Sequence, residues 1–383
     1  MTRQDTAPRI IYVSYDGVGE PLGRSQVLGY LARLAPDYDI ALISFEKSTE
    51  PRRSLHDELI EMGIEWLPLR YHRRPPVLST AWDIRAGKRA LIRAARRREP
   101  DIVHVRSYVP ALMALSARPR TNGKLLFDIR GFWADERVEG GLWRPDGLLY
   151  RAAKRYERRF FAEADAIVTL TQASVAQVRL WAGQRPVPIE VIPTCVDMQR
   201  FAHRPERPGG RHAVWSGSIG TWYRFDLAAK VARALTLPLT VITRQANLAR
   251  RILAGYPASV RSVAPEDVPS QLFAGDIGLC LIASSFSKVA SAPTRFAEYL
   301  AAGMPVLATS GVGDLEALVE DHQVGVVLRG DDDRSVVEAA GRVRALAEDR
   351  ETSERCRRVA LEHFDIDAGS VRYANIYRRM SER

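Results

Sequence analysis

The feature that most constrains the fold is an alternation of short, β-branched apolar runs with stretches of helical periodicity. The first cycle runs from the strand-like Arg9–Tyr15 through the glycine-rich turn Asp16–Gly23 to a helical pattern over Ser25–Leu34. Similar cycles follow as far as the apolar run Ala166–Leu170. Strands separated by helices at this spacing form parallel sheets with helices on both faces. We therefore expect a doubly wound α/β fold.

The alternation is interrupted once and then restarts. The stretch Arg185–Pro208 is rich in proline and short of periodic pattern, as is typical of a linker and its flanking strand, and a second series begins at His212–Trp215. A chain of 383 residues is long enough for about two domains. We expect two Rossmann-like domains that face each other across a cleft. The boundaries are an N-terminal domain over 1–185, a linker over 186–208, a second domain over 209–362 and a C-terminal helix over 363–383 that packs back toward the first domain.

The composition argues against several classes of protein. No apolar run reaches the roughly 18 residues that a membrane-spanning helix needs, and the polar stretch Met1–Arg9 does not resemble a signal peptide. The cysteines Cys195, Cys280 and Cys356 lie far apart without a CxxC spacing, which indicates neither a zinc site nor a disulfide framework. We expect a cytoplasmic protein.

The net charge of +10 points to an anionic partner. The stretch Trp82–Arg98 can form an amphipathic basic helix that contacts an anionic membrane surface, or merely a solvated helix face. No stacking pattern or motif for nucleic acid accompanies the charge, so nucleic acid is not an expected partner. The residues expected to face the membrane are Arg85, Lys88, Arg89, Arg93, Arg96, Arg97 and Arg98.

The loop with the clearest chemistry is Ser291–Glu298, which leads directly into a helical pattern. A helix N-terminus offers free N–H groups and partial positive charge to a phosphate. Arg295 would add a bidentate contact to a diphosphate, and Glu298 would accept two hydrogen bonds from a ribose diol. The alternative is an ordinary capped amphipathic helix with Gly303 just beyond its end.

This segment resembles glycosyltransferase family 4, in particular its bacterial polysaccharide branch. That branch often reads Ser-x-Pro-Thr-Lys-x-x-Glu-Tyr-x-Ala-x-Gly-x-Pro-Val in its second domain, and Arg295 stands here in place of the usual lysine. The matching residues are Ser291, Pro293, Thr294, Glu298, Tyr299, Ala301, Gly303, Pro305 and Val306.

The resemblance continues over most of the chain, in the same order as in the family. The further segments that resemble family motifs are Asp16–Gly17, Glu20–Gln26, Asp101–Ser107, Val191–Phe201 and Gly311–Glu316.

Two positions depart from the family pattern. Many members carry a glutamate eight positions before the equivalent of Glu298, where it contacts donor-sugar hydroxyls, but this chain has Ala290. Other groups, such as Ser291, must then hold the sugar. Many members also carry a histidine after the fifth strand of the first domain, where the alignment places Arg130. A guanidinium can stabilise negative charge there but cannot act as a base.

The sequence contains fewer motifs for an acceptor site than for the donor site. The stretch Phe132–Trp143 combines acids with aromatic residues near the expected strand ends, as a sugar acceptor site would, or as a surface Ω-loop would. His104 follows a strand and faces either the cleft or the core. Neither Asp331–Asp333 nor Asp365–Asp367 is placed like a metal site of a donor diphosphate.

The resemblance implies a retaining hexosyltransferase that moves a sugar from a UDP- or GDP-sugar to a hydroxyl of a glycan, lipid-linked or small-molecule acceptor in polysaccharide biosynthesis. It needs no metal and no cofactor. The alternatives are a nucleotide-sugar 2-epimerase and a non-catalytic nucleotide-sugar-binding protein on the same fold. The expected catalytic residues are Arg130, Arg295 and Glu298. The expected donor-binding residues also include Gly217, Ser218, Ser291, Pro293 and Thr294. The expected acceptor- or sugar-binding residues are Gly17, Gly19, His104, Asp135 and Glu136.

Overall fold

The computed structural model describes residues 7–47, 52–202 and 211–382. The chain divides into two compact units, of which unit 1 comprises Met1–Ile192 and Ile366–Arg383 and unit 2 comprises Pro193–Asp365. Part of the expected linker (203–208) and most of the stretch compared with a signal peptide (1–6) lie outside the described residues.

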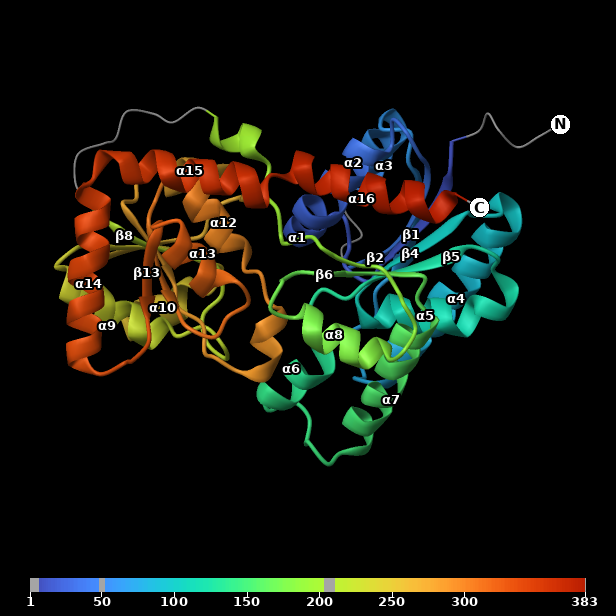
Figure 1. Cartoon of the computed structure of the whole chain (residues 1–383), viewed down its shortest axis with the longest axis horizontal. Helices are drawn as coiled ribbons and strands as arrows, with labels where there is room; N and C mark the ends of the chain where they lie inside the picture. The colour runs from blue at the N-terminus through green and yellow to red at the C-terminus, as the bar shows by residue number, and fades with distance from the viewer. Residues whose placement is uncertain (1–6, 48–51, 203–210, 383) are drawn as a thin grey trace. The chain divides into compact units, whose positions relative to one another are not determined.

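Unit 1 is built on a seven-stranded parallel sheet with the order β3-β2-β1-β4-β5-β6-β7 (Figure 1). The strands are β1 Arg9–Ser14, β2 Asp39–Glu46, β3 Glu65–Arg70, β4 Ile102–Arg106, β5 Lys124–Asp128, β6 Ala166–Thr169 and β7 Ile189–Val191. The helices are α1 Pro21–Gly23, α2 Gly29–Leu34, α3 Arg52–Glu61, α4 Leu78–Arg98, α5 Tyr108–Ala117, α6 Trp133–Glu139, α7 Leu148–Glu163, α8 Val175–Ala182 and α16 Ile366–Ser381.

Unit 2 has a six-stranded parallel sheet with the order β10-β9-β8-β11-β12-β13. Its strands are β8 Ala213–Ser216, β9 Leu239–Ile242, β10 Ala258–Arg261, β11 Ile277–Cys280, β12 Val306–Thr309 and β13 Gly325–Leu328. The helices are α9 Phe225–Leu235, α10 Ala246–Ile252, α11 Val268–Leu272, α12 Thr294–Ala301, α13 Leu315–Asp321, α14 Asp333–Glu348 and α15 Arg350–Phe364.

The sequence explains why these segments become central strands. In β1, Ile10 to Val13 are an unbroken apolar run, and all of them are buried. Such runs belong in sheets that are covered on both faces, because alternate side chains point to opposite layers. The two parallel sheets confirm the predicted α/β class.

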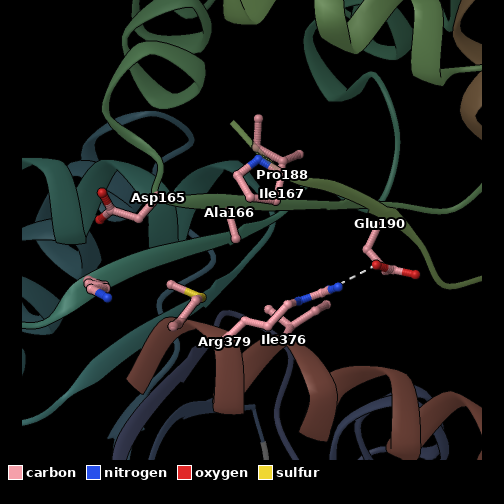
Figure 2. A pocket seen from close by; sticks show the side chains of 9 residues that line it. Asp165, Ala166, Ile167, Pro188, Glu190, Ile376 and Arg379 are labelled. Carbon is pink, nitrogen blue, oxygen red and sulfur yellow. Dashed lines mark hydrogen bonds and ion pairs between the residues drawn. The ribbon is translucent and has the colours of Figure 1, made fainter. Parts of the chain in front are cut away.

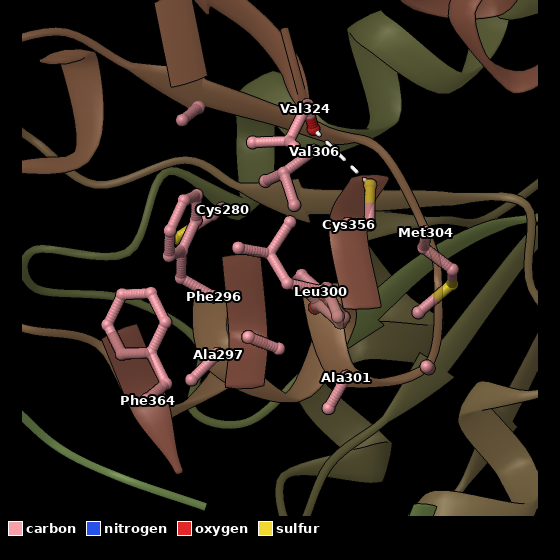
Figure 3. Packing of buried hydrophobic residues seen from close by; sticks show 14 of the residues in the cluster. Cys280, Phe296, Ala297, Leu300, Ala301, Met304, Val306, Val324, Cys356 and Phe364 are labelled. Carbon is pink, nitrogen blue, oxygen red and sulfur yellow. Dashed lines mark hydrogen bonds between the residues drawn. The ribbon is translucent and has the colours of Figure 1, made fainter. Parts of the chain in front are cut away.

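Helix α12 lies at the centre of the core on one face of the second sheet (Figure 3). Leu300 packs there with Cys356 of α15, and the rings of Phe296 and Phe364 meet edge to face at 5.7 Å. Tyr299 lies across Gly278 of β11, where an added Cβ would be 2.3 Å from the ring. The helix that carries the predicted donor residues is therefore held firmly against the sheet and against α15.

The chain returns to unit 1 after α15. Helix α16 packs against α2, and Tyr38 of unit 1 donates a hydrogen bond to the carbonyl of Ala374 (2.9 Å; Figure 1). Within the described residues, no helix combines the length and the apolar character needed to cross a bilayer.

Local structure differs from expectation in two places. Residues Trp133–Glu139 form helix α6 instead of a loop, because Ala134 to Glu139 carries no helix breaker before Gly140. The expected linker is ordered at its start, since Ile189–Val191 pairs with β6 as strand β7. This is the strand that was expected to flank the linker, and it lies within the predicted linker bounds of 186–208.

Candidate functional site

Each sheet has one point at which the strand order reverses. It lies between β1 and β4 in unit 1 and between β8 and β11 in unit 2. Ligands of open α/β sheets bind beyond the carboxyl ends of the strands at such a point. Gly217 follows β8 directly, and the loop after β11 leads into α12, so the predicted donor residues belong to this edge of unit 2.

Gly217 and Arg295 fit against each other. Gly217 has φ +109°, and a Cβ at this position would lie 2.5 Å from Nη2 of Arg295. A larger residue would therefore be strained in its backbone and would also displace the guanidinium. Ser218, the next residue, is exposed. The glycine thus leaves the space that the arginine occupies.

Arg295 is buried between two aromatic rings. Its guanidinium carbon lies 4.8 Å from the ring centre of Trp215 and 4.5 Å from that of Tyr223, and its side chain is among the buried polar groups. Nη1 has no hydrogen-bond partner among the described residues. Stacking on rings stabilises a cation without neutralising it. Unit 2 therefore presents a buried positive charge at the end of its sheet.

The first turn of α12 is uncapped. Pro293 is the N-cap residue and has no side-chain acceptor, so that the described part of the chain provides no side-chain cap hydrogen bond here. Thr294 begins the helix, and Ser291, two residues before the cap, donates its N–H to the carbonyl of Lys288 at 3.1 Å. Ser291, Pro293 and Thr294 are all half-buried. The start of the helix keeps its partial positive charge beside Arg295.

Glu298 lies one turn into the same helix and is half-buried. Burial raises the pKa of Glu298, although the nearby charges of Arg200 and Arg295 act in the opposite direction. Burial thus disfavours the charged form of this group, and hydrogen bonds donated by a diol would favour the carboxylate.

Lys288 is a further cation at this edge that the sequence analysis did not single out. It is buried, with Nζ 4.2 Å from the ring centre of Trp222, and its carbonyl also accepts a hydrogen bond from the N–H of Gly313 (2.8 Å). Ala290, at the position of the family's usual first glutamate, is completely buried. Only the closeness of Lys288 to the conspicuous Ser291–Glu298 segment pointed to it.

The equivalent edge of unit 1 contains an internal charge network around Asp128, the last residue of β5. Its Oδ2 accepts a hydrogen bond from the hydroxyl of Tyr373 (3.0 Å) and lies 3.8 Å from Arg130 Nη1. Arg106 and His104 approach the same atom to 3.7 and 3.8 Å. Asp128 was not among the predicted site residues, although the sequence placed it beside Arg130.

The groups of this network influence one another's ionisation. Burial alone would raise the pKa of Asp128, but Arg130, His104 and Arg106 lower it below its usual range. Burial lowers the pKa of His104, whose Nδ1 lies 2.7 Å from the hydroxyl of Tyr377. His104 is 1% exposed. This placement favours the core alternative for His104 over a cleft-facing role.

The glycine-rich loop after β1 is anchored by Glu46, another residue that the sequence did not single out. Glu46 accepts hydrogen bonds from the N–H groups of Val18 (2.9 Å) and Gly19 (3.2 Å). A Cβ on Gly17 would lie 2.7 Å from its Oε2. The N–H groups of this loop thus point to a carboxylate of the protein itself, and the glycines allow the close approach.

The two predicted acidic residues, Asp135 and Glu136, are neighbours on helix α6 but have different surroundings. Asp135 is buried and accepts hydrogen bonds from Tyr150 (2.8 Å) and Lys154 (2.9 Å), both of α7. Glu136, the next residue of the helix, is half-buried. Asp135 therefore joins α6 to α7, and Glu136 is the more accessible of the pair.

The basic residues of α4 form a stripe on one face. Arg85, Arg89, Arg93, Arg96 and Arg97 are exposed, whereas Lys88 and Arg98 are half-buried. Arg97 and Arg98 form ion pairs with Glu65. Trp82, one turn before Arg85, is 62% exposed. The stripe thus starts with an apolar ring and continues with arginines.

The aspartate runs that were compared with metal sites have other partners. Asp332 caps α14 by accepting the N–H of Ser335 (3.0 Å), and Asp331 pairs with Arg224 (3.2 Å). Asp365 forms an isolated parallel bridge with Val196.

A cavity of about 260 Å³ lies beneath α16 (Figure 2). It borders Lys124 and Ala166, the first residues of β5 and β6, and Arg379 on its rim pairs with Glu190 at 3.0 Å. The cavity therefore lies at the amino ends of the strands, opposite the edge where ligands of such sheets bind.

Comparison with known proteins gives a family match for part of the chain and a fold for nearly all of it. Residues 26–200 match the model of Glycosyltransferase Family 4. No curated protein matches the chain by sequence.

Similar solved structures cover nearly the whole chain. A glycosyltransferase from Rickettsia africae has a TM-score of 0.71 at 14% identity, covering 98% of this chain and 99% of its own. Sucrose-phosphate synthase from Thermosynechococcus elongatus has a TM-score of 0.73 at 13% identity, covering 97% and 99%. Anabaena HepE in complex with UDP-glucose has a TM-score of 0.64 at 15% identity, covering 96% and 98%. At these identities the likeness shows the fold, which is the GT-B fold.

Proposed function

We propose that the chain, whose residues 26–200 match the model of Glycosyltransferase Family 4, transfers a hexose-type unit from a UDP- or GDP-sugar to a hydroxyl acceptor, with retention of configuration and without a metal ion. The single observation that carries this proposal is the buried guanidinium of Arg295, whose Nη1 has no hydrogen-bond partner among the described residues, beside the start of α12.

The chemistry requires the positive groups of unit 2 to act on the leaving group. Arg295 and the first turn of α12 hold the donor diphosphate, where negative charge grows as the bond from the sugar to the phosphate oxygen breaks. Preorganised donors at such a point lower the barrier, because they need no rearrangement during the reaction. Glu298 accepts hydrogen bonds from the ribose hydroxyls and so fixes the nucleoside.

The acceptor reacts on the face that the diphosphate leaves. The acceptor oxygen forms its bond to the sugar's anomeric carbon while the phosphate oxygen departs with the bonding electrons. The departing oxygen then takes the acceptor's proton, so that no protein base is required. This displacement on one face retains the configuration.

A UDP-sugar is the preferred donor in this proposal, because Anabaena HepE, which shares the fold, binds UDP-glucose. The Ser291 hydroxyl and the backbone before α12 would hold the sugar in place of the usual glutamate, since Ala290 is buried and apolar.

The acceptor would bind to unit 1 near Gly17, Gly19, Arg130 and Glu136. It would be a glycan, a lipid-linked sugar or a small molecule.

The stripe on α4 supports a peripheral membrane contact, with Trp82 in the headgroup region and Arg85, Arg89 and Arg93 on anionic lipid. A cytoplasmic location remains a prediction from the sequence.

A thermal-shift screen of nucleoside diphosphates tests the donor site, because a ligand that binds only the folded state raises its apparent stability. We expect UDP or GDP to raise the melting temperature and the corresponding nucleoside to do so much less. Turnover of the selected donor with a panel of glycan acceptors then tests transfer. If no nucleotide shifts the melting curve at millimolar concentration, the assignment of the α12 edge is wrong.

Binding to vesicles tests the membrane contact separately. Replacing Arg85, Arg89 and Arg93 together with alanine should reduce binding to phosphatidylserine vesicles, whereas Arg342→Ala on α14 should not. Equal binding by all three proteins would contradict this contact.

A further inference from the structure

Two histidines and a glutamate of unit 2 meet where helices α13 and α15 end. His322 ends α13, and Glu362 and His363 lie in the last turn of α15. One ligand atom from each of these residues lies within 4.8 Å of the others. The rings of His322 and His363 have their centres 5.1 Å apart at an angle of 66°. Both histidines are half-buried and Glu362 is exposed.

This set of donors suits a borderline-soft divalent cation. Zinc is commonly held by imidazole nitrogens and carboxylate oxygens at about 2.0–2.2 Å in a tetrahedron, where neighbouring ligand atoms are about 3.3 Å apart. The observed limit of 4.8 Å is thus wider than a loaded site by about 1.5 Å. Rotation of partly exposed side chains can close this gap without a change in the backbone.

The local electrostatics favour a cation at the same place. Helices α13 and α15 both end there, at Asp321 and Phe364. The carboxyl end of a helix carries partial negative charge, so two such ends attract a positive ion. Asp321, next to His322, is exposed and adds a further negative charge. These dipoles and the carboxylates act in the same direction.

We propose that His322, Glu362 and His363 form a binding site for Zn²⁺, separate from the donor site, with water in the fourth position. Metal at this site connects the end of α13 to the end of α15. His363 immediately precedes Phe364, whose ring packs on Phe296 of α12 and whose carbonyl accepts the N–H of Val196 (2.8 Å). The ion would therefore stabilise the helix pair that supports the donor helix, without contacting the donor.

Few other groups compete for the metal. All three cysteines are buried, and burial raises the pKa of both Cys280 and Cys356 to about 12, which keeps these thiols protonated. His104 is buried in unit 1 beside Tyr377. His72 is held by Asp83 through both its ring and its backbone N–H.

The test is a calorimetric titration of the full, untagged chain with Zn²⁺, after treatment with a chelator and dialysis into a non-coordinating buffer. We expect one Zn²⁺ per chain. His322→Ala and His363→Ala should each weaken binding by about 10–100-fold or more, since loss of even an outer-shell partner costs that much. His56→Ala, which removes an exposed histidine of α3, should bind like the original chain.

A second readout identifies the ligands. Co²⁺ bound in a tetrahedral site absorbs strongly in the visible range, and we expect this absorption to vanish in the His363→Ala variant. Melting curves of the metal-free variants show whether they are folded; if His363→Ala is not, His363→Gln replaces it. Failure of the original chain to bind Zn²⁺ at micromolar concentration, or unchanged binding by both histidine variants, overturns the proposal. Neither result depends on nucleotide binding.

Discussion

The two sheets end in opposite electrostatic arrangements. In unit 1, Asp128 lies within 4 Å of groups on His104, Arg106 and Arg130, so the cations share an internal counter-ion. In unit 2, Arg295 is stacked between rings, and Nη1 has no partner among the described residues. A buried cation without a salt-bridge partner of its own costs stability, which fits the proposal that Arg295 contacts a diphosphate. In this comparison, the charges of unit 1 pair with one another, whereas the charge of Arg295 is stabilised by aromatic rings.

Removing the central acid of unit 1 should have the largest effect. We expect Asp128→Asn to reduce the free energy of unfolding by about 3–5 kcal/mol, because it leaves buried arginines without their counter-ion. Urea unfolding measures the change. Asp331→Asn, an exposed acid paired with Arg224, is the control and should change stability by less than about 0.5 kcal/mol. A loss below about 1 kcal/mol for Asp128→Asn would show that the network is not structural.

Replacing Arg295 should affect catalysis far more than folding. We expect Arg295→Met to lower the turnover number by about 10–100-fold, since a charge-assisted contact to the leaving group is worth about 1.5–3 kcal/mol. The donor's Michaelis constant should change less. Lysine should restore part of the activity, because it keeps the charge but not the fork of donors. Steady-state kinetics at saturating donor decide the point, with Arg224→Met as the paired-arginine control. Normal turnover by the methionine variant would mean that Arg295 does not contact the diphosphate.

Glu298→Gln should weaken the binding of nucleotide and donor together by about tenfold, which corresponds to ~1.4 kcal/mol.

The Glu298→Gln variant should remain folded. Since the pKa of Glu298 is raised in the folded protein, its ionisation opposes folding above that pKa, and glutamine removes this cost. The stability gained by the variant should therefore be present at neutral pH and vanish below the ordinary value of 4.5. Calorimetry and pH-dependent unfolding measure the two effects. Unchanged affinity for the nucleoside diphosphate would remove Glu298 from the site.

The smallest effect is expected from chelation. Excess EDTA should leave the transfer rate within about twofold, because positive groups of the chain stabilise the diphosphate in the proposed mechanism. A rate that falls with EDTA and returns with Mg²⁺ or Mn²⁺, but not with Zn²⁺, would show that a metal binds in the donor site.

Local patterns in the sequence were sufficient for the fold class and for the helix that carries Arg295 and Glu298. The β-branched runs predicted the strands, and Arg295 and Glu298 were selected as candidate donor residues because they lie within one contiguous motif. Asp128 and Glu46 were missed, since their importance arises from partners distant in the chain, such as Tyr373 and Gly19. The cluster of His322, Glu362 and His363 was missed for the same reason, because His322 and His363 are separated by β13, α14 and most of α15. No periodicity or spacing rule connects such residues before the chain folds.

The discontinuity of unit 1 has a consequence for how the protein is made. Tyr373 and Tyr377 of α16 complete the hydrogen bonds of Asp128 and His104, but they are translated only after all of unit 2. At about 5–20 residues per second, the nascent first unit waits roughly 10–40 s for them. During this interval the first unit lacks α16. Its buried charged groups then lack the two tyrosines, and the surface that α16 later covers is exposed. Unit 2, which is continuous in sequence, can complete its own core first. The docking of α16, and with it the completion of the core of unit 1, can therefore follow only after unit 2 has been synthesised.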